Sequence, residues 1–479
     1  MTRIPALASA LLTASAIAMS TALPAHAATT LRSLAEAKGR YFGTAMTTGD
    51  VANGTESSLA GTQFDMVTPG NEMKWDTTEP SNGSYNFGPG DQIVSFAQSH
   101  SMRVRGHNLV WHSQLPGWVS SLPLNQVQGA MESHITTEAT HYKGKVYAWD
   151  VVNEPFNEDG SLRQDVFYNA MGTGYIADAL RTAHAADPNA KLYLNDYNIE
   201  GENAKSNGLY SLAQSLLSQG VPLNGIGLES HFIVGQVPSS MQANMQRFAD
   251  LGLDVAVTEL DDRIQLPATS ATLQQQATDY GNVTKYCLAV SRCVGISQWG
   301  VDDGHSWIPG TFPGYGAATM YDSSYQPKPA YNATVTALGG SSSGGGGGST
   351  GPLHAVGAGK CLDVPNSSTT LGTQTQIYTC SGAANQTWTK SSSGQLTVTL
   401  GGTTLCLDAY GKGTTAGTKV ETWSCNGQSN QQWTFNSNGT ISGVQSGLCL
   451  DVTGASTANG ALVELWTCNG GSNQQWSLG

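Results

Sequence analysis

The chain has 479 residues, of which only 12% are charged, and its formal net charge is −13. This length is too great for one ordinary domain. An acidic protein of low charge density is poorly suited to bind nucleic acid or an anionic membrane surface, so we expect neither partner. The 57 Gly, 17 Tyr and 11 Trp instead favour an extracellular protein that acts on a neutral, sugar-like substrate.

Residues 1–27 have the features of a secretory signal peptide. Arg3 supplies the positive start, residues 6–23 are apolar or small, and Ala25-His26-Ala27 has the form of a cleavage site. A membrane anchor is the alternative, but the apolar run is only marginally long enough to span a bilayer. We therefore expect a secreted, extracellular protein without a membrane span.

The eight cysteines agree with an oxidising environment. Cys287 and Cys293 are close neighbours, and the other six form pairs of equal spacing, namely Cys361 with Cys380, Cys406 with Cys425 and Cys449 with Cys468. A zinc site is the competing interpretation, but the chain has no CxxC spacing. We predict four local disulfides, no metal and no cofactor.

Eight apolar, strand-like runs recur before residue 338. They begin near Tyr41, Met66, Arg103, Ala148, Lys191, Gly225, Asp254 and Gly295. Helical spacing is clear between them at residues 91–100, 175–186, 207–219 and 241–251. Because polar and aromatic residues follow nearly every run, we predict a closed (β/α)₈ TIM barrel over residues 28–338, in which all the strand ends meet at one mouth. An open doubly wound sheet is the alternative, but it gathers such groups only at a switch point.

Two of these apolar runs end in a glutamate. Residues 148–153 lead to Glu154, and residues 254–258 lead to Glu259. Two further runs lie between them, so the two strands are expected roughly across the barrel from each other. A pair of carboxylates that flanks a glycosidic bond is what glycoside hydrolysis requires. The chain contains 35 Asp and Glu, so the position at buried strand ends is the informative part of the pattern.

After residue 338 the composition changes abruptly. Residues 339–350 are only Gly, Ser and Thr, and we predict a flexible linker over residues 339–352. Residues 353–479 then contain three repeats, each with a Cys-Leu-Asp motif, which begin at Cys361, Cys406 and Cys449. Short strands and Gly/Asn/Ser turns predict an all-β domain with pseudo-threefold symmetry.

The barrel motifs resemble those of family-10 glycoside hydrolases, the endo-β-1,4-xylanases. The resemblance runs from Tyr41 to about Leu338, through NEMK at 71–74, RGH at 105–107, WHSQ at 111–114, WDVVNE at 149–154, NDYN at 195–198, SHF at 230–232, TELD at 258–261 and WGV at 299–301. It implies hydrolysis of internal bonds in xylan with retention of configuration. The same chemistry on cellulose or mixed-linkage glucan, and a catalytically inactive lectin-like protein, are the alternatives.

The resemblance also implies a role for each matching residue. Glu154 is expected to be the acid/base and Glu259 the nucleophile, with His231 and Asp261 holding Glu259. Asn153 is expected to bind the 2-hydroxyl of the sugar at the cleavage point. The other expected substrate-binding residues are Asn71, Lys74, His107 and Trp111 on the glycone side, with Gln114, Tyr197, Trp299 and Trp307 around them. For any one of these residues, such as His107 or Trp299, the alternative is a purely structural role in the barrel core.

Three positions depart from the family pattern. Gly70 stands where many xylanases have Glu, Ile308 where Arg is frequent, and Glu229 where Gln is usual. A third carboxylate near the pair favours protonation of one member. We therefore expect Glu229 to raise a macroscopic pKa and to shift the acidic limb of the pH profile.

The repeats resemble the ricin B-chain type β-trefoil, a family-13 carbohydrate-binding module. Each repeat closes with Gln-x-Trp, at residues 386–388, 431–433 and 474–476, which we expect to form core and turn elements. The sugar contacts implied by the resemblance are Asp363, Gln376, Tyr378 and Asn385 in the first repeat, Asp408, Trp423 and Asn430 in the second, and Asp451, Trp466 and Asn473 in the third. Glu421 and Glu464 replace Gln376, so the sites are expected to differ. We expect a monomer that binds xylan and xylo-oligosaccharides.

Overall fold

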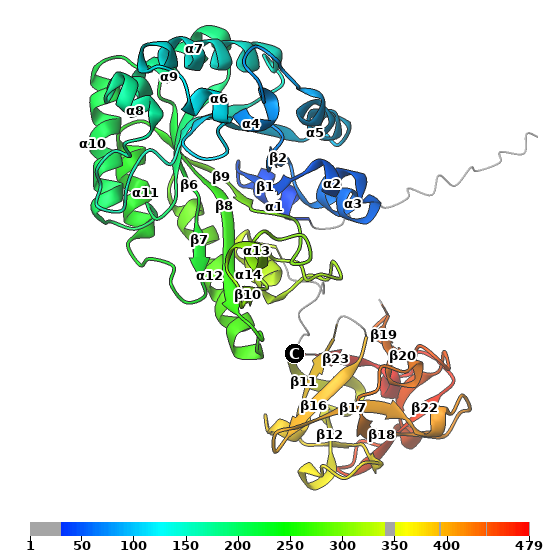
Figure 1. Ribbon diagram of the computed structural model, residues 1–479. Coiled ribbons are helices and arrows are strands. Elements are labelled where there is room, and N and C mark those ends of the chain that lie inside the picture. The colour runs from blue at the N-terminus through cyan, green and yellow to red at the C-terminus, as the bar shows by residue number, and fades with distance from the viewer. Residues whose placement is uncertain (1–29, 341–349, 392–393, 437, 479) are drawn as a thin grey trace, which may run out of the picture.

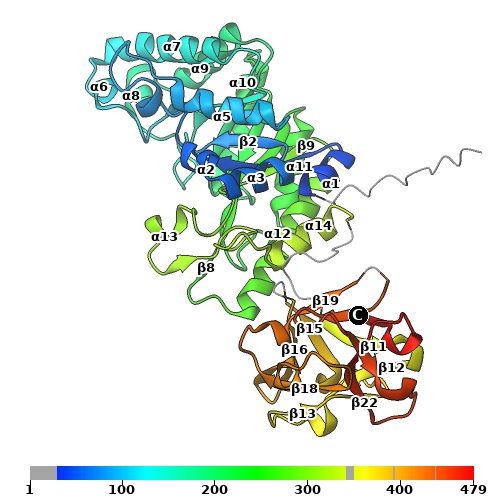
Figure 2. The same ribbon diagram turned by 90° about the vertical axis from the view of Figure 1, so that its right-hand side faces the viewer.

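The computed structural model describes residues 30–340, 350–391, 394–436 and 438–478 (Figure 1). The predicted signal peptide and most of the predicted linker lie outside these residues. The described chain forms an N-terminal domain of strands and helices and a C-terminal domain built from strands (Figure 2). None of its helices combines the length and the hydrophobicity needed to cross a bilayer.

The N-terminal domain is a closed barrel of eight parallel strands. These are β1 (Tyr41–Met46), β2 (Met66–Pro69), β3 (Arg103–Trp111), β4 (Ala148–Asn153), β5 (Lys191–Asp196), β6 (Gly225–Leu228), β8 (Asp254–Gln265) and β9 (Cys293–Gln298). They pair in this order, and β9 pairs with both β8 and β1. The ring is therefore complete, which confirms the predicted TIM barrel and rules out the open sheet. Seven strands begin at the predicted residue, and β9 begins two residues earlier, at Cys293.

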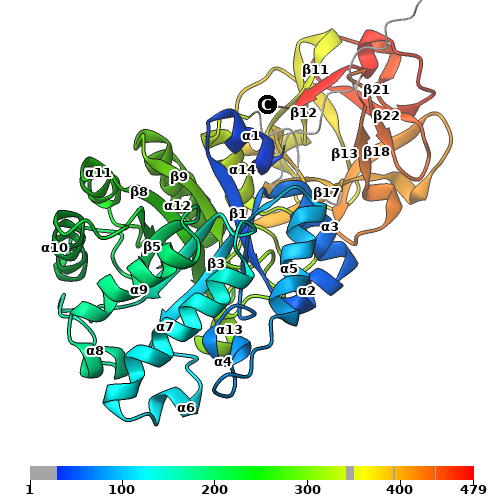
Figure 3. The same ribbon diagram turned by 90° about the horizontal axis from the view of Figure 1, so that it is seen from above.

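Helices surround this ring on its outer face (Figure 3). They are α1 (Leu31–Ala37), α2 (Thr48–Ala52), α3 (Gly54–Gln63), α4 (Trp75–Thr78), α5 (Gly88–Ser99), α6 (Gly117–Ser120), α7 (Leu124–His141), α8 (Val166–Met171), α9 (Gly174–Ala186), α10 (Ala204–Ser218), α11 (Met241–Asp250), α12 (Ser270–Ala289), α13 (Ile308–Thr311) and α14 (Pro329–Ala337). The predicted start of α10 is three residues late, because Asn203 caps the helix by accepting a hydrogen bond from the backbone N–H of Ser206.

The interior of the barrel is filled by large side chains below the mouth. Tyr41, Met66 and Tyr193 belong to one buried cluster inside the ring. The fully buried guanidinium of Arg105 lies over the ring of Tyr193, 4.5 Å from its centroid, and pairs with the carboxylate of Asp150. A buried charge is tolerated only when it is paired, and here each of the two charged groups neutralises the other. The ion pair forms a buried polar layer beneath the mouth.

One strand extends beyond the barrel at the mouth. β8 is 12 residues long, and its outer half pairs with β7 (His231–Ile233) and with β10 (Tyr315–Gly316). In this extension His231 lies opposite Asp261. The extra pairing therefore places polar side chains from two neighbouring strands above the barrel core.

The C-terminal domain contains β11 (Thr350–Ala355), β12 (Lys360–Asp363), β13 (Thr373–Gln374), β14 (Gln376–Tyr378), β15 (Thr387–Lys390), β16 (Leu396–Leu400), β17 (Thr403–Ala409), β18 (Thr418–Ser424), β19 (Trp433–Phe435), β20 (Ile441–Gly443), β21 (Cys449–Val452), β22 (Ala461–Trp466) and β23 (Trp476–Leu478). Short 3₁₀ turns lie between them, at Val356–Ala358, Pro365–Ser367, Ala384–Gln386, Tyr410–Lys412, Ser429–Gln431, Thr453–Ala455 and Ser472–Gln474. This arrangement is consistent with the predicted β-trefoil.

Each repeat buries the tryptophan of its Gln-x-Trp motif in the shared core. The indole N–H of Trp388 donates to the carbonyl of Leu362, and Trp433 and Trp476 make the equivalent bond to Leu407 and Leu450. Because a buried indole N–H needs a partner, this bond fixes the end of every repeat in the same way. The motif is a core element, as predicted.

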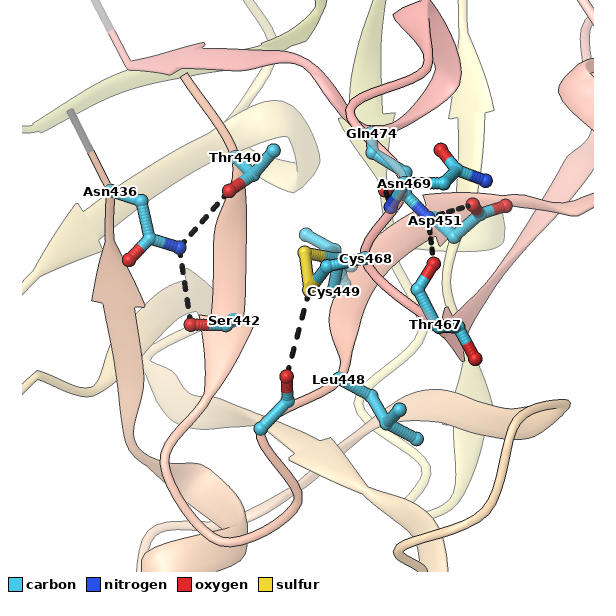
Figure 4. The surroundings of a disulfide bond; sticks show 12 residues. Asn436, Thr440, Ser442, Leu448, Cys449, Asp451, Thr467, Cys468, Asn469 and Gln474 are labelled. Atoms are coloured by element: carbon cyan, nitrogen blue, oxygen red, sulfur yellow. Dashed lines mark hydrogen bonds between the residues drawn. A yellow bond between two sulfur atoms is a disulfide. The ribbon is translucent and has the colours of Figure 1, made fainter. Parts of the chain in front are cut away.

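All four predicted disulfides are present. Three of them cross-link equivalent places in the repeats, and Figure 4 shows the one between Cys449 and Cys468. Cys449 lies on β21 opposite Trp466 of β22, two residues before Cys468. Each of these bonds therefore closes a hairpin of its repeat.

The predicted linker is wrong at its C-terminal end. Residues 350–352 belong to β11, where Thr350 and Pro352 lie opposite Thr389 and Thr387 of β15. Gly and Pro are poor strand formers, but here tertiary pairing overrides their weak propensity. At the other end, Gly339 adopts φ +85° and the N–H of Gly340 donates to Val335, so the first linker glycines terminate α14.

Candidate active site

A cavity of about 680 Å³ opens at the carboxyl ends of the barrel strands. Every predicted catalytic or substrate-binding residue of the barrel except Asp261 lines it. These residues are Asn71, Lys74, His107, Trp111, Gln114, Asn153, Glu154, Tyr197, His231, Glu259, Trp299 and Trp307. Strand ends that are far apart in sequence are therefore brought to one place.

Glu154 follows the last residue of β4 and has an unusual backbone. Its φ is +51°, a conformation that non-glycine residues rarely adopt. Its N–H donates to the carbonyl of Asn195 at 2.8 Å, and its own carbonyl accepts from Arg163 Nε at 3.1 Å. These two bonds hold the backbone where β4 ends and the loop begins.

The environment of Glu154 favours its protonated form. Burial raises the pKa of Glu154, and the negative charge of Glu259 raises it further, although Trp111, Arg163 and Lys205 act in the opposite direction. His112 Nε2 lies 3.8 Å from Glu154 Oε2. Burial lowers the pKa of His112 to about 4, so this imidazole is neutral and does not favour the carboxylate. His112 was not among the predicted site residues.

Glu259 has the opposite electrostatic environment. Burial alone would raise its pKa, but the charges of His107 and His231 and a hydrogen bond from His231 outweigh burial and lower the pKa of Glu259. His231 Nε2 lies 3.3 Å from Glu259 Oε2, and Asn195 Nδ2 donates to Oε1 at 2.9 Å. Glu259 is therefore an anion held by directed donors, whereas Glu154 is an acid.

His231 is itself held by a buried carboxylate. Its Nδ1 lies 3.0 Å from Asp261 Oδ2, which also accepts a 2.7 Å hydrogen bond from Trp307 Nε1. Burial would lower the pKa of His231, but Asp261 and Glu259 raise it to about 10, so the ring is a cation. Asp261 has no exposed surface and lies behind His231, which explains why it does not line the cavity.

Asn195 connects the two halves of the site. Its amide donates to Asn153 Oδ1 at 2.8 Å as well as to Glu259, and its Oδ1 accepts from Thr258 Oγ1 at 2.7 Å. These bonds assign the Asn153 oxygen as an acceptor and leave the Asn153 NH₂ group to act in the cavity. The sequence placed Asn195 at a strand end but gave it no role.

A second polar network lies beside Trp111. Lys74 Nζ donates to Asn71 Oδ1 at 3.1 Å and to Gln114 Oε1 at 2.7 Å, and Gln114 donates to Asn71. Lys74 also lies 5.0 Å from the centre of the Trp111 ring. Asn71, Lys74 and Trp111, which are expected on the glycone side, therefore lie in contact with one another or with Gln114.

Several cavity residues were not predicted as site residues. Asp50, Asn198, Arg263, His305 and Phe312 all line the mouth. Most of them lie on the connections or on the β8 extension, where no strand-end signal marks them. Arg263 lies over Phe312, 4.1 Å from the ring centre.

The family departures lie in different environments. Gly70 lines the cavity, and a Cβ built there would first meet Thr47 Cγ2 at 3.5 Å, so the position has room for a side chain. Ile308 is fully buried and contributes nothing to the cavity wall.

Glu229 is the third carboxylate of the site and is 2% exposed. Its Oε1 accepts from Asn195 Nδ2 at 3.2 Å, and its Oε2 lies 3.7 Å from His231 Nε2. Burial, followed by the charges of Glu259 and Glu154, raises the pKa of Glu229 well above its usual range. Glu229 is therefore the protonated member of the three carboxyl groups, in line with the expected raised pKa. Because it is neutral where Glu259 ionises, its replacement by Gln is now expected to leave the acidic limb in place.

In the C-terminal domain, an aspartate of each repeat is held by side-chain amides. Asp363 Oδ2 accepts from Asn385 at 2.7 Å and from Gln386 at 2.9 Å. The equivalent bonds join Asp408 to Asn430 and Gln431, and Asp451 to Asn473 and Gln474. An exposed aromatic ring lies two residues beyond the strand partner of each aspartate, namely Tyr378, Trp423 and Trp466.

The partner of the aspartate differs among the repeats. Gln376 donates to Asp363 Oδ1 at 2.8 Å in the first repeat. In the second, Glu421 lies opposite Asp408 and pairs with Lys419 Nζ at 2.7 Å. In the third, Glu464 lies opposite Asp451. The structure thus shows that the predicted difference between the three sites extends to their hydrogen bonding.

Residues 30–337 match the family described as glycosyl hydrolase family 10, and residues 349–476 match the ricin-type beta-trefoil lectin domain. This chain belongs to glycosyl hydrolase family 10. It is 51% identical over 314 residues to endo-1,4-beta-xylanase A of Phanerodontia chrysosporium, covering 64% of this chain and 77% of that relative. It is 50% identical over 310 residues to an endo-1,4-beta-xylanase of Agaricus bisporus, covering 64% and 93%.

Solved structures of family-10 members agree with this assignment. Xylanase 10B of Thermotoga petrophila in complex with xylobiose superposes with a TM-score of 0.64 at 39% identity, covering 66% of this chain and 98% of that one. A glycosylated endo-beta-1,4-xylanase of Gloeophyllum trabeum gives 0.63 at 43% identity, covering 64% and 98%.

Within the described residues, three groups of side chains place possible metal-ligating atoms within 4.8 Å of one another. One is Glu229, His231 and Glu259, in which His231 already pairs with both acids. Another includes Cys361 and Cys380, which form a disulfide and offer no thiolate. The third is Glu56, Asp302 and His305, at the edge of the cavity.

The charge of His231 leads to a prediction for the pH profile. His231→Gln removes the cation beside Glu259, so the pKa of Glu259 rises and the acidic limb of kcat/KM moves to higher pH by about 1–3 units. The limb is measured on a soluble oligosaccharide substrate, where kcat/KM reports groups of the free enzyme.

Glu229→Gln is the matched control, because it changes another neighbour of Glu259 but replaces one neutral group by another. Its acidic limb is expected to stay in place. A shift of equal size in both variants would contradict the assignment of the charge to His231.

Proposed function

We propose that this protein is a secreted endo-1,4-β-xylanase that hydrolyses internal bonds of xylan with retention of configuration. The observation that carries the proposal is the pair Glu154 and Glu259, whose pKa values shift in opposite directions within one cavity of a family-10 barrel. The names of the relatives support xylan as the substrate. The four disulfides support an extracellular location.

The first step is an attack by Glu259 on the anomeric carbon. Glu154 donates its proton to the glycosidic oxygen as the bond to the leaving sugar breaks, and a covalent glycosyl-enzyme forms. The negative charge of Glu259 is then consumed. Because that charge is one cause of the raised pKa of Glu154, the pKa of Glu154 falls after this step.

The second step uses the same residues in reverse. Glu154, now a carboxylate, takes a proton from water, the water oxygen attacks the anomeric carbon, and the bond to Glu259 breaks. The product keeps the original configuration because the carbon is inverted twice. His231 and Asp261 keep Glu259 a competent nucleophile and leaving group.

The remaining residues are proposed to bind the sugar. Asn153, oriented by Asn195, donates to the 2-hydroxyl at the cleavage point. Lys74 and its amide partners bind hydroxyls on the glycone side. The indoles of Trp111, Trp299 and Trp307 cover apolar faces of the chain, and Tyr197, His107, Asn71 and Gln114 complete the wall. These assignments rest on cavity position and family pattern together.

The C-terminal domain is proposed to hold the enzyme on its polymer. Each repeat combines an aspartate that accepts from hydroxyls with an exposed aromatic platform. Three weak sites that engage one polymer raise the overall affinity without new contacts. The sites consist of Asp363, Gln376, Tyr378 and Asn385, of Asp408, Trp423 and Asn430, and of Asp451, Trp466 and Asn473. The protein is proposed to act as a monomer.

The function is tested by the release of reducing sugar from xylan and from carboxymethylcellulose, side by side. Release from xylan alone supports the proposal. Preferential release from carboxymethylcellulose would favour the alternative β-1,4-glucanase, which must accommodate a C6 hydroxymethyl group. No release from either polymer by the folded protein would favour the inactive lectin-like alternative.

The role of Glu154 is tested by Glu154→Ala. The first step on an aryl xyloside with a good leaving group needs little protonation, so glycosylation should persist while turnover falls by about 10²–10⁴-fold. Added azide, a nucleophile that needs no general base, should restore turnover and give the β-glycosyl azide. Glu202→Ala, which changes an exposed acid, is the control. Equal loss of both steps without azide rescue would refute the role.

The module sites are tested by retention on insoluble xylan. Tyr378→Ala, Trp423→Ala and Trp466→Ala are expected to weaken binding modestly as single changes and by more than 10-fold together, because avidity needs several sites. Val444→Ala removes a side chain that is 52% exposed outside these sets and should retain binding. Unchanged retention of the triple variant would contradict the assignment.

A further inference from the structure

Three potential metal ligands meet at the edge of the cavity without a role in the proposed reaction. Glu56 belongs to the first turn of α3, and Asp302 and His305 follow β9. His305 Nδ1 lies 2.8 Å from Asp302 Oδ2 and 3.3 Å from Glu56 Oε2. The cluster therefore joins two segments that are far apart in the sequence.

Glu56 is buried in an unusual way. It has no exposed surface, and neither of its carboxylate oxygens has a hydrogen-bond partner within the described residues. The carboxylate points at the cluster, because its Oε2 faces His305 Nδ1. A buried carboxylate normally has donors around it or coordinates a metal, and the Glu56 carboxyl faces the His305 ring and the carboxyl of Asp302.

The charges around Glu56 do not balance. Asp302 is fully buried, and Asp50 of α2 adds a third carboxylate that acts on Glu56. Within the described residues, Asp50 and Asp302 raise the pKa of Glu56, and His305 is the main electrostatic neighbour that lowers it. Three carboxyl groups therefore share one imidazole.

The spacing of the donor atoms suits a small divalent cation. Zinc binds His nitrogen and carboxylate oxygen at about 2.0–2.2 Å, and for tetrahedral coordination this places neighbouring donor atoms about 3.4 Å apart. The observed 3.3 Å between His305 Nδ1 and Glu56 Oε2 is close to that value. The 2.8 Å between Nδ1 and Asp302 Oδ2 is a hydrogen-bond distance, which a bound metal would lengthen. Imidazole with two carboxylates is a ligand set typical of zinc and related first-row metals.

We propose that Glu56, Asp302 and His305 bind one divalent transition-metal cation, for which Zn²⁺ is the representative probe. Because His305 is 43% exposed, the cation has an entry path and room for water as a further ligand. The ring of Tyr325 stacks on His305 with centroids 6.2 Å apart, and its hydroxyl accepts from Asn53 Nδ2 at 2.8 Å. Tyr325 therefore supports the orientation of the imidazole.

The cation would connect α3 to the loop that carries Trp307. That loop positions the indole that donates to Asp261, and both His305 and Asp50 line the cavity. The expected effect is stabilisation of the cavity rim. Binding of the cation and the stability of the rim can both be measured without any substrate.

Proton release distinguishes this site from a surface histidine. Burial raises the pKa of Glu56 to about 8, with the charge of Asp50 acting in the same direction and that of His305 opposing it. A hydrogen bond to Asp302 raises the pKa of His305. Because a metal binds the deprotonated ligands, its binding is expected to release protons from the cluster.

The experiment is calorimetric titration of the full chain with Zn²⁺ at pH 7 in buffers of different ionisation enthalpy. All variants are made in a background protein that already carries Glu229→Gln. This change removes one potential metal ligand from the group formed by Glu229, His231 and Glu259, so that Zn²⁺ binding there is weakened. One Zn²⁺ per chain, release of protons on binding and a rise in Tm with Zn²⁺ are expected.

Asp302→Asn is expected to weaken Zn²⁺ binding at least 10-fold. His305→Gln serves as the second variant, since its half-exposed side chain can be replaced without disturbing the core. Asp322→Asn changes an aspartate of the same part of the chain outside the cluster and should bind as the background does. Absence of stoichiometric binding, or equal binding by the background, Asp302→Asn and His305→Gln, would overturn the proposal.

Discussion

The active site depends on one buried cation, His231. It lies between Asp261 and Glu259. Together with His107, its charge and hydrogen bond overcome the desolvation that would otherwise protonate Glu259. Burial acts on Glu154 in the same way, and there it remains the largest effect and raises the pKa. Two glutamates at the barrel mouth thus acquire opposite protonation states, because His107 and His231 outweigh burial at Glu259 whereas Arg163 and Lys205 do not outweigh it at Glu154.

The fold explains why His231 is available at that place. β6 ends at Leu228, and the chain passes through Glu229 and Ser230, whose φ is +67°, before β7 begins. β7 then pairs with the extension of β8, which places His231 opposite Asp261. An ordinary barrel strand would have ended before this pairing. The longer β8 is therefore the structural element on which the charge network rests.

The sequence predicted the barrel and the repeats, and it placed Glu154 and Glu259 at the barrel mouth, because each of these features leaves a local pattern. Apolar runs mark strands, and a polar residue after a run marks the mouth of a barrel. Asn195 carried this signal, but its role depends on contacts with Asn153 and Glu259 that only the folded ring creates. His305 and Phe312 carry no such signal, since connections have no periodicity, and Arg263 lies on the extension of β8 beyond the predicted strand end. The end of the linker was misplaced because Gly and Pro hide a strand that tertiary pairing imposes.

In both domains a side-chain amide donates a hydrogen bond to a carboxylate and fixes its position. Buried amides fix Glu259 through Asn195 and fix Asp363, Asp408 and Asp451 through the Gln of each Gln-x-Trp motif. That Gln is therefore both a core residue and the support of the proposed sugar-binding aspartate. In the first repeat Gln376 occupies the second oxygen of Asp363, whereas a carboxylate at the same position cannot donate when ionised. Within the described residues, the second oxygen of Asp408 and Asp451 thus has no equivalent amide donor, and the three repeats are chemically distinct despite their common fold.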